Sequence, residues 1–519
     1  HHRHLIRTAA QTRRRRRLQP HVPAAEGRAH AGQDDQLMRD LTCSHLLVAA
    51  DAPVTHRQTV RIDGDRIAAV DPAAQDAAAE PVLALPVLCN AHDHARTVRT
   101  SSIGASGKPL EIWLHYMALV PSVDPYLAAA VSLARSALGG AGVVMVHYTR
   151  TQGLTDLPTE AAEVARAARD VGIRVGFAVA MRDRNPLVYG PSEPILDALP
   201  HDAREEIRNR FIRTPLSPAA QLALVDAVAE AAGGPTFDVQ YGPQGVQWCT
   251  HEMLTAVAEA SALTGRRVHM HLLETRYQRA WADTAYPDGI VRYLDEIGLL
   301  SPRLTLAHCT WARPDELELL AERGAIISAN ASSNLSLRSG IAPVAEMIQR
   351  GCRVALGLDG ATLDEDDDAL RELRLSHLLH GGTGFRVDIS RATTLARVLR
   401  TGRVSVLNRD DGGRLAAGEP ADLLLLDWDA VDDDRLRPDV DPLDLMFARA
   451  TAQQIGEMIV GGRTVVRAGK VTGIDFPAMR DELHARLRAG MAGNAAFAAA
   501  LGALERVVHP HFEAEPPCC

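Results

Sequence analysis

The sequence predicts an α/β protein: a (β/α)8 TIM barrel with a small β-sandwich domain formed by the N- and C-terminal flanks. Short apolar segments typical of buried strands alternate with Ala-rich segments of helical spacing. Residues 86–405 hold eight such pairs, which is the size of a β/α barrel. A doubly wound sheet is the alternative, but no glycine-rich phosphate-binding motif follows the first strand. The predicted strands are residues 86–89, 143–147, 174–181, 236–241, 268–272, 304–308, 325–329 and 353–358.

Short strands with turn signals flank the barrel on both sides. Residues 46–48, 59–62 and 66–70 precede it, and residues 421–427, 455–460 and 464–467 follow it. We expect these two groups to pair into one small sandwich. The predicted divisions are a basic leader (1–40), the first part of the sandwich (41–85), the barrel (86–405), the second part of the sandwich (406–475) and a C-terminal helical tail (476–519).

The first forty residues differ from the rest of the chain. Residues 13–17 are all arginine, and the segment has almost no apolar periodicity. A basic run can bind nucleic acid or address an organelle. The missing apolar stretch behind it argues against a secretory signal, and we expect a disordered leader.

Composition excludes several classes of function. The net charge of −9 gives no general attraction to nucleic acid or to an anionic membrane. No apolar run approaches the ~20 residues that span a bilayer. The 7 cysteines are scattered, which suits reduced thiols in the cytoplasm. We therefore expect a cytoplasmic protein with no nucleic-acid or membrane partner, and we also expect a homo-oligomer, a dimer or higher.

Residues of metal-ligand type follow the ends of several predicted strands. His92 and His94 are two residues apart and so share one face of an extended chain. His271 ends the fifth strand, His308 ends the sixth, and Asp359 follows the eighth. The C-terminal ends of barrel strands meet at one face. Imidazoles suit Zn²⁺ or Fe²⁺ better than Mg²⁺ or Ca²⁺, so we expect one divalent transition metal ion.

The predicted metal ligands are His92, His94, His271 and Asp359. Because these four already complete a shell, we assign His308 to polarising the group under attack, with metal ligation as its alternative role. A bound ion can lower the pKa of water from ~15.7 to about 7. His269 faces the same way as His271 but one layer deeper, which favours a supporting or core role over ligation.

The attack of hydroxide requires a proton shuttle, and Glu274 lies three residues beyond His271. The alternative is a structural acid in the first turn of a helix, where the helix dipole favours negative charge. The position of Glu274 beside the strand-end His271 favours the catalytic role. We therefore predict Glu274, His308 and Asp359 as the catalytic residues.

Aromatic residues near the predicted catalytic face suggest a flat substrate. Trp113, Trp248 and Trp311 each follow a strand end in a chain with only 4% aromatic residues. Tryptophan rings stack well on planar ring systems. We predict these three as substrate-binding residues, together with Gln244 in the loop after the fourth strand, His308, and Asn334 in the loop after the seventh.

These motifs together resemble the amidohydrolase superfamily, in particular its mononuclear aminohydrolase branch of cytosine, guanine and adenosine-analogue deaminases and triazine hydrolases. Residues 90–94 are similar to the family's Asn-Ala-His-x-His motif, and residues 271–274 to its His-Leu-Ala-Glu motif. Residues 306–308, 358–360 and 332–335 resemble its motifs at strands six, eight and seven. The resemblance implies that His271 and Asp359 bind the metal, that Glu274 moves protons, and that His308 contacts the substrate and the attacking water. It covers roughly residues 41–475.

Two departures concern the substrate. Ala331 stands where a proline often precedes the Ser-Asn of the strand-seven loop, and the strand-four loop, residues 242–249, has no recognisable specificity. The expected function is a metal-dependent aminohydrolase that releases ammonia from an amino-substituted nitrogen heterocycle of the pterin, purine, pyrimidine or triazine type. One alternative is a hydrolase that removes chloride, an alkylamine or an amide. The other is a catalytically dead barrel that serves as a binding or scaffold protein.

Overall fold

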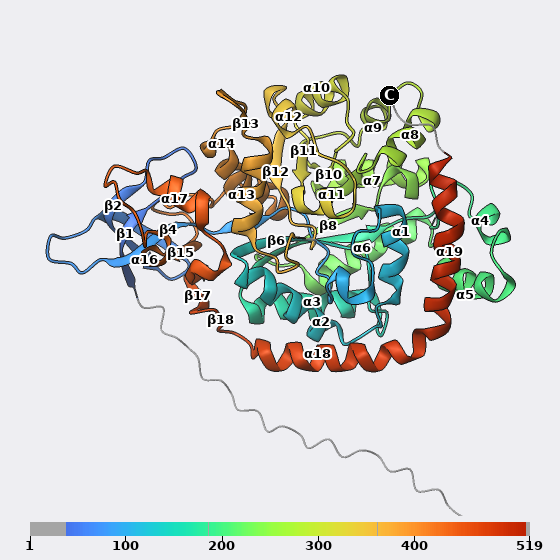
Figure 1. Ribbon diagram of the computed structural model, residues 1–519, viewed down its shortest axis with the longest axis horizontal. Helices are drawn as coiled ribbons and strands as arrows, with labels where there is room; N and C mark the ends of the chain where they lie inside the picture. Colours follow the sequence, from blue (N-terminus) through green and yellow to red (C-terminus); the bar gives the residue numbers. More distant parts are fainter. Residues whose placement is uncertain (1–37, 185, 361, 515–519) are drawn as a thin grey trace, which may run out of the picture. The chain divides into compact units, whose positions relative to one another are not determined.

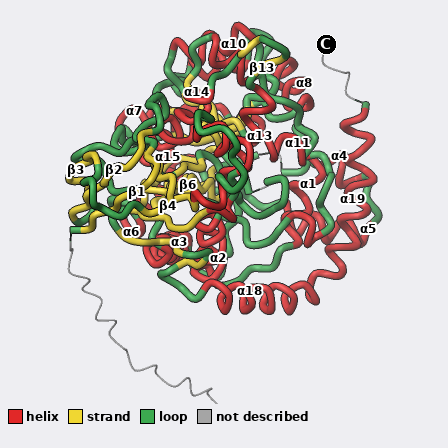
Figure 2. The backbone as a smooth tube through the Cα atoms, turned by 60° about the vertical axis from the view of Figure 1, so that its left-hand side comes forward, coloured by secondary structure: helices red, strands yellow, loops and turns green. Residues whose placement is uncertain are grey.

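The barrel predicted from the sequence forms the centre of the computed structural model, which describes residues 38–184, 186–360 and 362–514. Within these residues, one parallel sheet of 8 strands runs in the order β12-β11-β10-β9-β8-β7-β6-β5. Helices cover the outside of this sheet (Figure 2). Its strands are β5 (Leu88–Asn90), β6 (Ala141–Tyr148), β7 (Arg174–Met181), β8 (Phe237–Pro243), β9 (Val268–Leu272), β10 (Leu304–His308), β11 (Ile326–Ala329) and β12 (Arg353–Leu356).

Hydrogen bonds between the ends of the first and last strands and the residues that follow them bring the site residues together. The Ala91 N–H donates to the carbonyl oxygen of Leu356 at 2.9 Å, and the Asp359 N–H donates to that of His92 at 2.8 Å. The Leu358 N–H donates to Asn90 Oδ1 at 2.9 Å. The Asn90 side chain therefore helps to close the barrel beside the two histidines that follow it.

Most of the longer helices begin at a side chain that caps the first turn. Asp156 accepts a hydrogen bond from the Thr159 N–H, and Thr250 accepts one from the Met253 N–H. The helices of the barrel region are α1 (Leu110–Tyr116), α2 (Pro125–Leu138), α3 (Leu157–Val171), α4 (Glu193–Asp197), α5 (His201–Phe211), α6 (Pro218–Ala232), α7 (His251–Thr264), α8 (Arg276–Ala285), α9 (Ile290–Glu296), α10 (Pro314–Glu322), α11 (Ala331–Ser336), α12 (Val344–Gln349), α13 (Ala369–His380), α14 (Arg391–Ala396) and α15 (Gly402–Leu407).

Short helical turns and one small hairpin complete this region. The turns are η1 (Thr100–Ile103), η2 (Met117–Leu119), η3 (Val246–Trp248) and the π-helical η4 (Arg397–Thr401). The hairpin is β13 (Gly382–Thr383) with β14 (Arg386–Val387).

The two flanks pair as expected and form one mixed sheet of 8 strands within the described residues, in the order β18-β17-β16-β15-β4-β1-β2-β3. Strand β4 of the first flank runs antiparallel to β15 of the second. The strands are β1 (Arg39–Leu46), β2 (Thr55–Asp63), β3 (Arg66–Pro72), β4 (Glu80–Pro86), β15 (Leu423–Asp427), β16 (Ile455–Val460), β17 (Arg463–Arg467) and β18 (Lys470–Val471), with α16 (Trp428–Val431), α17 (Pro442–Arg449) and η5 (Ala452–Gln454) between them.

Strand alternation in β15 explains how this sheet serves two cores. Leu423 and Leu425 point into a cluster formed within the sheet, together with Leu41 and Ile62. The intervening Leu424 and Leu426 join the large core of the barrel. The unbroken run of leucine in this strand therefore reflects burial on both faces.

Two helices occupy the predicted C-terminal tail and pack against the barrel (Figure 1). Helix α18 (Phe476–Met491) places Leu483 and Leu487 against residues of α2. Helix α19 (Ala495–Glu513), reached through η6 (Ala492–Asn494), packs Phe497 and Leu504 against Ile207 of α5. The tail thus supports the helices that surround the C-terminal end of the barrel.

The predicted leader lies largely outside the described residues, which begin at Met38. Strand β1 begins at Arg39, two residues before the expected start of the first flank, and the Arg39 guanidinium pairs with Glu457 at 2.7 Å. The cysteines at positions 43, 89, 249, 309 and 352 are buried free thiols. Among the described helices, none is both long and apolar enough to cross a membrane.

Candidate active site

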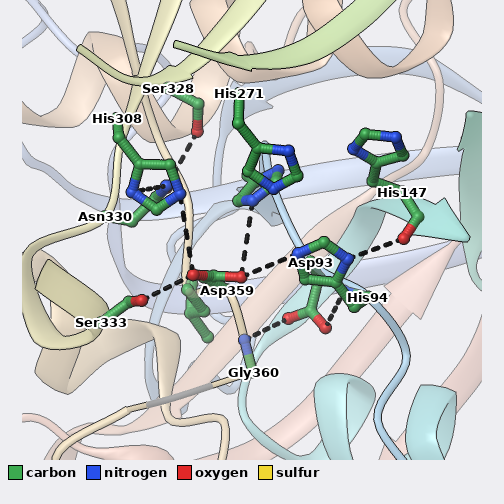
Figure 3. Close-up of polar contacts among 12 residues, drawn as sticks. Asp93, His94, His147, His271, His308, Ser328, Asn330, Ser333, Asp359 and Gly360 are labelled. Carbon is green, nitrogen blue, oxygen red and sulfur yellow. Dashed lines mark hydrogen bonds and ion pairs between the residues drawn. The ribbon is translucent and has the colours of Figure 1, made fainter. Parts of the chain in front are cut away.

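A cavity of about 310 Å³ opens at the C-terminal ends of the barrel strands. Its lining includes His94, His271, Glu274, His308 and Asp359. Figure 3 shows Asp359 lying between His94 on one side and His308 on the other. His92 does not line the cavity, but its Nε2 lies 3.4 Å from Asp359 Oδ1. The structure therefore brings together the strand-end residues that the sequence predicted.

The rings of His92 and His94 are each fixed at their outer nitrogen. His92 Nδ1 shares a hydrogen bond of 2.8 Å with Nε2 of the buried His269. His94 Nδ1 donates to the carbonyl oxygen of His147 at 2.8 Å. Such contacts set the tautomer and orientation of a metal-binding imidazole. Both rings then direct Nε2 at Asp359 Oδ1, at 3.4 Å for His92 and 3.1 Å for His94.

His271 and His308 are held in the same manner. His271 Nδ1 donates to the carbonyl oxygen of Gln244 at 2.7 Å. His308 Nδ1 bonds to Asn334 Oδ1 at 2.8 Å. Burial lowers the pKa of the His271 imidazole well below its usual value, and neighbouring imidazoles lower it further. A neutral ring with its Nδ1 occupied leaves Nε2 free to bind a metal.

Asp359 is the central carboxylate of the site. Its Oδ2 accepts a hydrogen bond of 2.5 Å from the Ser333 hydroxyl, and Arg96 contacts both its backbone and its side chain. Burial alone raises the pKa of Asp359, but Arg96, His92 and His94 outweigh burial and hold the pKa well below its usual range. The carboxylate is therefore charged and can act as a metal ligand.

The donor set fits a transition metal ion. The ligand atoms of His92, His94 and Asp359 lie within 4.8 Å of one another, as do those of His92, His271 and His308. Among the described residues, the buried Nε2 atoms of His92 and His308 have no hydrogen-bond partner. Buried polar atoms are rarely left unpaired, so this pattern indicates a site for an ion. The groups of residues that could hold an ion include His308 as well as the predicted ligands.

Glu274 lies beside these residues and is 2% exposed. Its Oε2 is 3.5 Å from His308 Nε2, and its Oε1 accepts a hydrogen bond of 3.3 Å from the Ser339 hydroxyl. Burial raises the pKa of Glu274 well above its usual value, and the charges of Asp359 and Glu111 raise it further. A raised pKa makes this carboxyl a stronger base than a free glutamate, so it can accept a proton and hold it for transfer.

Four residues at the strand ends have left-handed backbone conformations. The φ angles are 49° at Leu273, 77° at His308, 48° at Cys309 and 57° at Asp359. Residues other than glycine rarely adopt this region, and such strain clusters at functional sites. At His308 and at Asp359, the strained backbone lies where the chain turns out of a strand and toward the cavity.

The predicted substrate residues divide into two groups. Trp113, Gln244 and Trp248 line the cavity. Trp311 lies outside this lining and borders a neighbouring cavity, where its Nε1–H donates to the Ser339 carbonyl at 2.7 Å. Asn334 is also absent from the lining, and its Oδ1 bonds to His308 Nδ1. Its position suits orientation of His308 better than contact with a substrate.

Sequence reasoning missed several residues that shape the site. Arg96 follows His94 at the same two-residue interval that separates His92 from His94, a spacing that signals a shared location. Its guanidinium lies 4.6 Å from the centre of the Trp113 ring. Ser333 was part of a recognised motif, but no sequence feature singled it out as the partner of Asp359.

Comparisons with known proteins agree with this geometry. The model of the amidohydrolase family matches residues 83–487. A 5′-deoxyadenosine deaminase of Methanopyrus kandleri is 34% identical over 242 residues, 46% of this chain and 55% of that protein. A 5-methylthioadenosine/S-adenosylhomocysteine deaminase of Moorella thermoacetica is 27% identical over 467 residues, 88% of this chain and 99% of that protein.

A solved structure shows the same fold. The adenosine deaminase from Xanthomonas campestris, with zinc bound, has a TM-score of 0.71 at 20% identity, and the alignment covers 87% of this chain and 98% of that one. The family match spans the end of the first flank, the barrel, the whole second flank and part of α18, and the strand-end motifs lie inside it. The chain belongs to the amidohydrolase family.

Proposed function

We propose that this protein is a metal-dependent aminohydrolase that deaminates adenine nucleosides. One observation carries the proposal: histidine rings fixed at Nδ1 converge on Asp359 at the floor of a cavity, with Glu274 beside them. Two relatives that match by sequence are deaminases of 5′-substituted or 5′-deoxy adenine nucleosides. These substrates belong to the class of amino-substituted heterocycles that the sequence predicted.

We assign His92, His94, His271 and Asp359 as ligands of one Zn²⁺ ion. Imidazole and carboxylate ligands suit Zn²⁺ and Fe²⁺ alike, and the zinc bound in the solved deaminase of the same fold supports Zn²⁺. When bound, the ion lowers the pKa of water from ~15.7 to about 7. The ligand atom of His308 lies within 4.8 Å of those of His92 and His271, so His308 could also bind the ion. We retain its role beside the substrate because its Nε2 also faces Glu274.

Glu274 is proposed to move the protons of the reaction. Its carboxyl receives a proton from the attacking water and passes it to a nitrogen of the adenine ring. The water oxygen bonds to the ring carbon, its second proton passes to the amino group, the C–N bond breaks, and the amine leaves as ammonia. The raised pKa of Glu274 supports this role, because the carboxyl must hold a proton between the two transfers.

His308 and Asp359 are proposed to manage the attacking water. His308 is oriented by Asn334 at Nδ1 and so presents Nε2 toward Glu274 and Asp359, at 3.5 and 3.8 Å. Asp359 stays charged and accepts a hydrogen bond from the water. The walls of the cavity contribute Trp113 and Trp248, whose rings are suited to a flat base.

The test is ammonia release by the zinc-loaded protein from 5′-deoxyadenosine, followed together with the absorbance change from adenine to hypoxanthine. We expect stoichiometric ammonia and hypoxanthine nucleoside. Release of chloride or an alkylamine from a triazine, with no ammonia from any adenine nucleoside, would support the alternative hydrolase. A protein that neither binds metal nor hydrolyses any of these compounds would support a scaffold. Homo-oligomerisation and a cytoplasmic location remain predictions.

A further inference from the structure

The wall of the same cavity is strongly basic. Arg150 follows β6, Arg182 follows β7 and Arg210 lies in α5, and all three line the cavity whose floor holds the histidines. In the described part of the chain, none of these guanidinium groups forms an ion pair with a carboxylate, although such pairs are frequent elsewhere in this protein. Guanidinium groups at a cavity wall that form no ion pair suggest that the ligand supplies the partner.

The contacts of Arg150 and Arg210 are with neutral groups. Arg150 donates to the carbonyl oxygen of Val120. Arg210 donates to that of Ala118 at 3.5 Å and to Asn494 Oδ1 at 3.2 Å. A guanidinium carries five N–H donors, so each group keeps donors that these contacts do not use.

Arg150 and Arg210 lie close enough for their charges to repel. Burial lowers the pKa of Arg150, whereas Tyr148 and Glu160 act to raise it, and the charge of Arg210 lowers it. Among the described residues, Glu160 forms no ion pair with Arg150, and its carboxylate accepts hydrogen bonds from the Tyr148 hydroxyl at 2.5 Å and the Gln152 N–H at 2.6 Å. An anion in the cavity would relieve the repulsion between the two arginines.

We infer that the substrate carries an anionic group, a carboxylate or a phosphate, which Arg150 and Arg210 bind while Arg182 adds positive charge to the same wall. The inference rests on the proposed function and narrows it to adenine nucleosides with a negatively charged substituent at the 5′ position. A planar fork of donors suits both kinds of anion, and bidentate contacts make such binding specific.

A structural role is the competing explanation. Arg150 and Arg210 both contact carbonyls of residues 118–120, and the Arg210 guanidinium lies 4.3 Å from the centre of the Phe497 ring. In that case, replacing either arginine would affect neutral and anionic substrates equally. The two explanations therefore differ in whether the arginine variants lose more activity toward anionic substrates than toward neutral ones.

The experiment compares three nucleosides with the zinc-loaded protein: neutral 5′-methylthioadenosine, its analogue with a carboxymethyl group in place of the methyl, and adenosine 5′-monophosphate. Ammonia release gives kcat/KM for each. Because hydrogen bonds to charged groups are strong, we expect kcat/KM for at least one anionic compound to exceed that for the neutral one by about tenfold to hundredfold. Most of this difference should come from a lower KM. The carboxymethyl and phosphate arms distinguish the two kinds of anion.

Variants then test the residues. In Arg150→Gln and Arg210→Gln, we expect kcat/KM for the favoured anionic compound to fall about tenfold more than for the neutral one. Arg150→Lys keeps the charge and should restore part of the difference. Arg208→Gln is the matched control, since Arg208 is exposed on the same helix and does not line the cavity. Its substrate preference should match that of the wild type.

The outcomes separate the two proposals. Equal kcat/KM for neutral and anionic compounds, with ammonia released from both, would overturn the anionic subsite and leave the proposed function intact. Equal losses for both kinds of compound in the arginine variants would assign these residues a structural role. Ammonia from none of the three would overturn both proposals. If the variants fail to fold, the wild-type comparison alone decides.

Discussion

The two ends of the barrel hold buried carboxylates in opposite ways. At the N-terminal end, Asp422 bonds to Arg174 at 2.9 and 3.0 Å, to Arg403 at 2.8 Å and to the Gly461 N–H at 2.7 Å. At the C-terminal end, Asp359 faces imidazole nitrogens as well as one arginine, Arg96, and Nε2 of His92 has no hydrogen-bond partner among the described residues.

This difference separates a structural cluster from a functional one. Asp422 is matched by positively charged donors on both oxygens and joins the second flank to β7. The C-terminal end combines imidazole nitrogens without a hydrogen-bond partner among the described residues, a carboxyl of raised pKa at Glu274, and left-handed backbone at His308 and Asp359. Such features cost stability, and proteins retain them where a ligand or a reaction uses them.

The largest expected effect of a single change at the C-terminal end is that of Glu274→Gln. Glutamine keeps the shape of the side chain but cannot carry the proton. Proton transfer by a positioned group typically contributes 10²- to 10⁴-fold, about 3 to 5 kcal/mol of barrier. We expect turnover to fall at least a hundredfold, with thermal stability and metal content near those of the wild type.

The same preparation supplies the control for Glu274→Gln. Turnover within a few-fold of the wild type, with metal bound, would remove Glu274 from the mechanism. A large loss of thermal stability would point instead to a structural acid at the start of α8.

At the N-terminal end we expect loss of stability without loss of chemistry. Asp422→Asn leaves the buried Arg174 and Arg403 without their charged partner, and breaking a buried pair in this way costs about 3 kcal/mol. Denaturant unfolding measures the change. Asp40→Asn is the control, because the exposed Asp40–Arg61 pair at 3.2 Å should contribute under about 1 kcal/mol. Equal effects of both changes would contradict the structural role of Asp422.

A smaller effect is expected from His269, which does not line the cavity but holds His92. His269→Leu removes the bond to His92 Nδ1, and loss of such outer partners typically weakens metal binding by about 10- to 100-fold. His269→Gln can place a polar atom near the lost Nε2 and should recover part of the affinity. Competition with a chelator measures both. Unchanged affinity in His269→Leu would show that His92 needs no support.

The smallest expected effect is a change with pH in the contribution of Asp422 to the free energy of unfolding. Burial raises the pKa of this carboxyl, but Arg174 and Arg403 outweigh burial and hold the pKa below its usual value. A lowered folded-state pKa contributes stability above the unfolded-state pKa, ~3.9, and loses it as pH falls through the folded value. The difference in stability between wild type and Asp422→Asn should therefore be constant from about pH 5 to 8 and shrink below about pH 4. A difference that grows in acid would contradict this assignment.

The sequence predicted the barrel well because its signals are local. The buried strands read as short apolar runs, as in residues 304–308, and the structure places β10 at the same bounds. The convergence of His94, His271 and Asp359 followed from the geometry of any such barrel. Strand pairing between the flanks was also predictable, since both show the same alternation.

Other features depend on contacts between distant residues, which one sequence does not reveal. The bond between His92 and His269 joins residues 177 positions apart, and that between Ser333 and Asp359 depends on how the loop after β11 folds. Trp311 and Asn334 follow strands as expected, but local turns direct their side chains at Ser339 and His308. The arginines of the cavity wall lie on β-α loops and on α5, where no periodic pattern marks them.

The metal content of the purified protein tests the central claim most directly. The account predicts about one Zn²⁺ per chain after incubation with zinc and removal of excess, measured by elemental analysis, and clear loss of the ion in His271→Ala. Asp422→Asn should keep the ion, because its cluster lies at the opposite end of the barrel. A wild-type protein without stoichiometric metal, or His271→Ala that retains the full amount, would contradict the assignment of the C-terminal end as a metal centre.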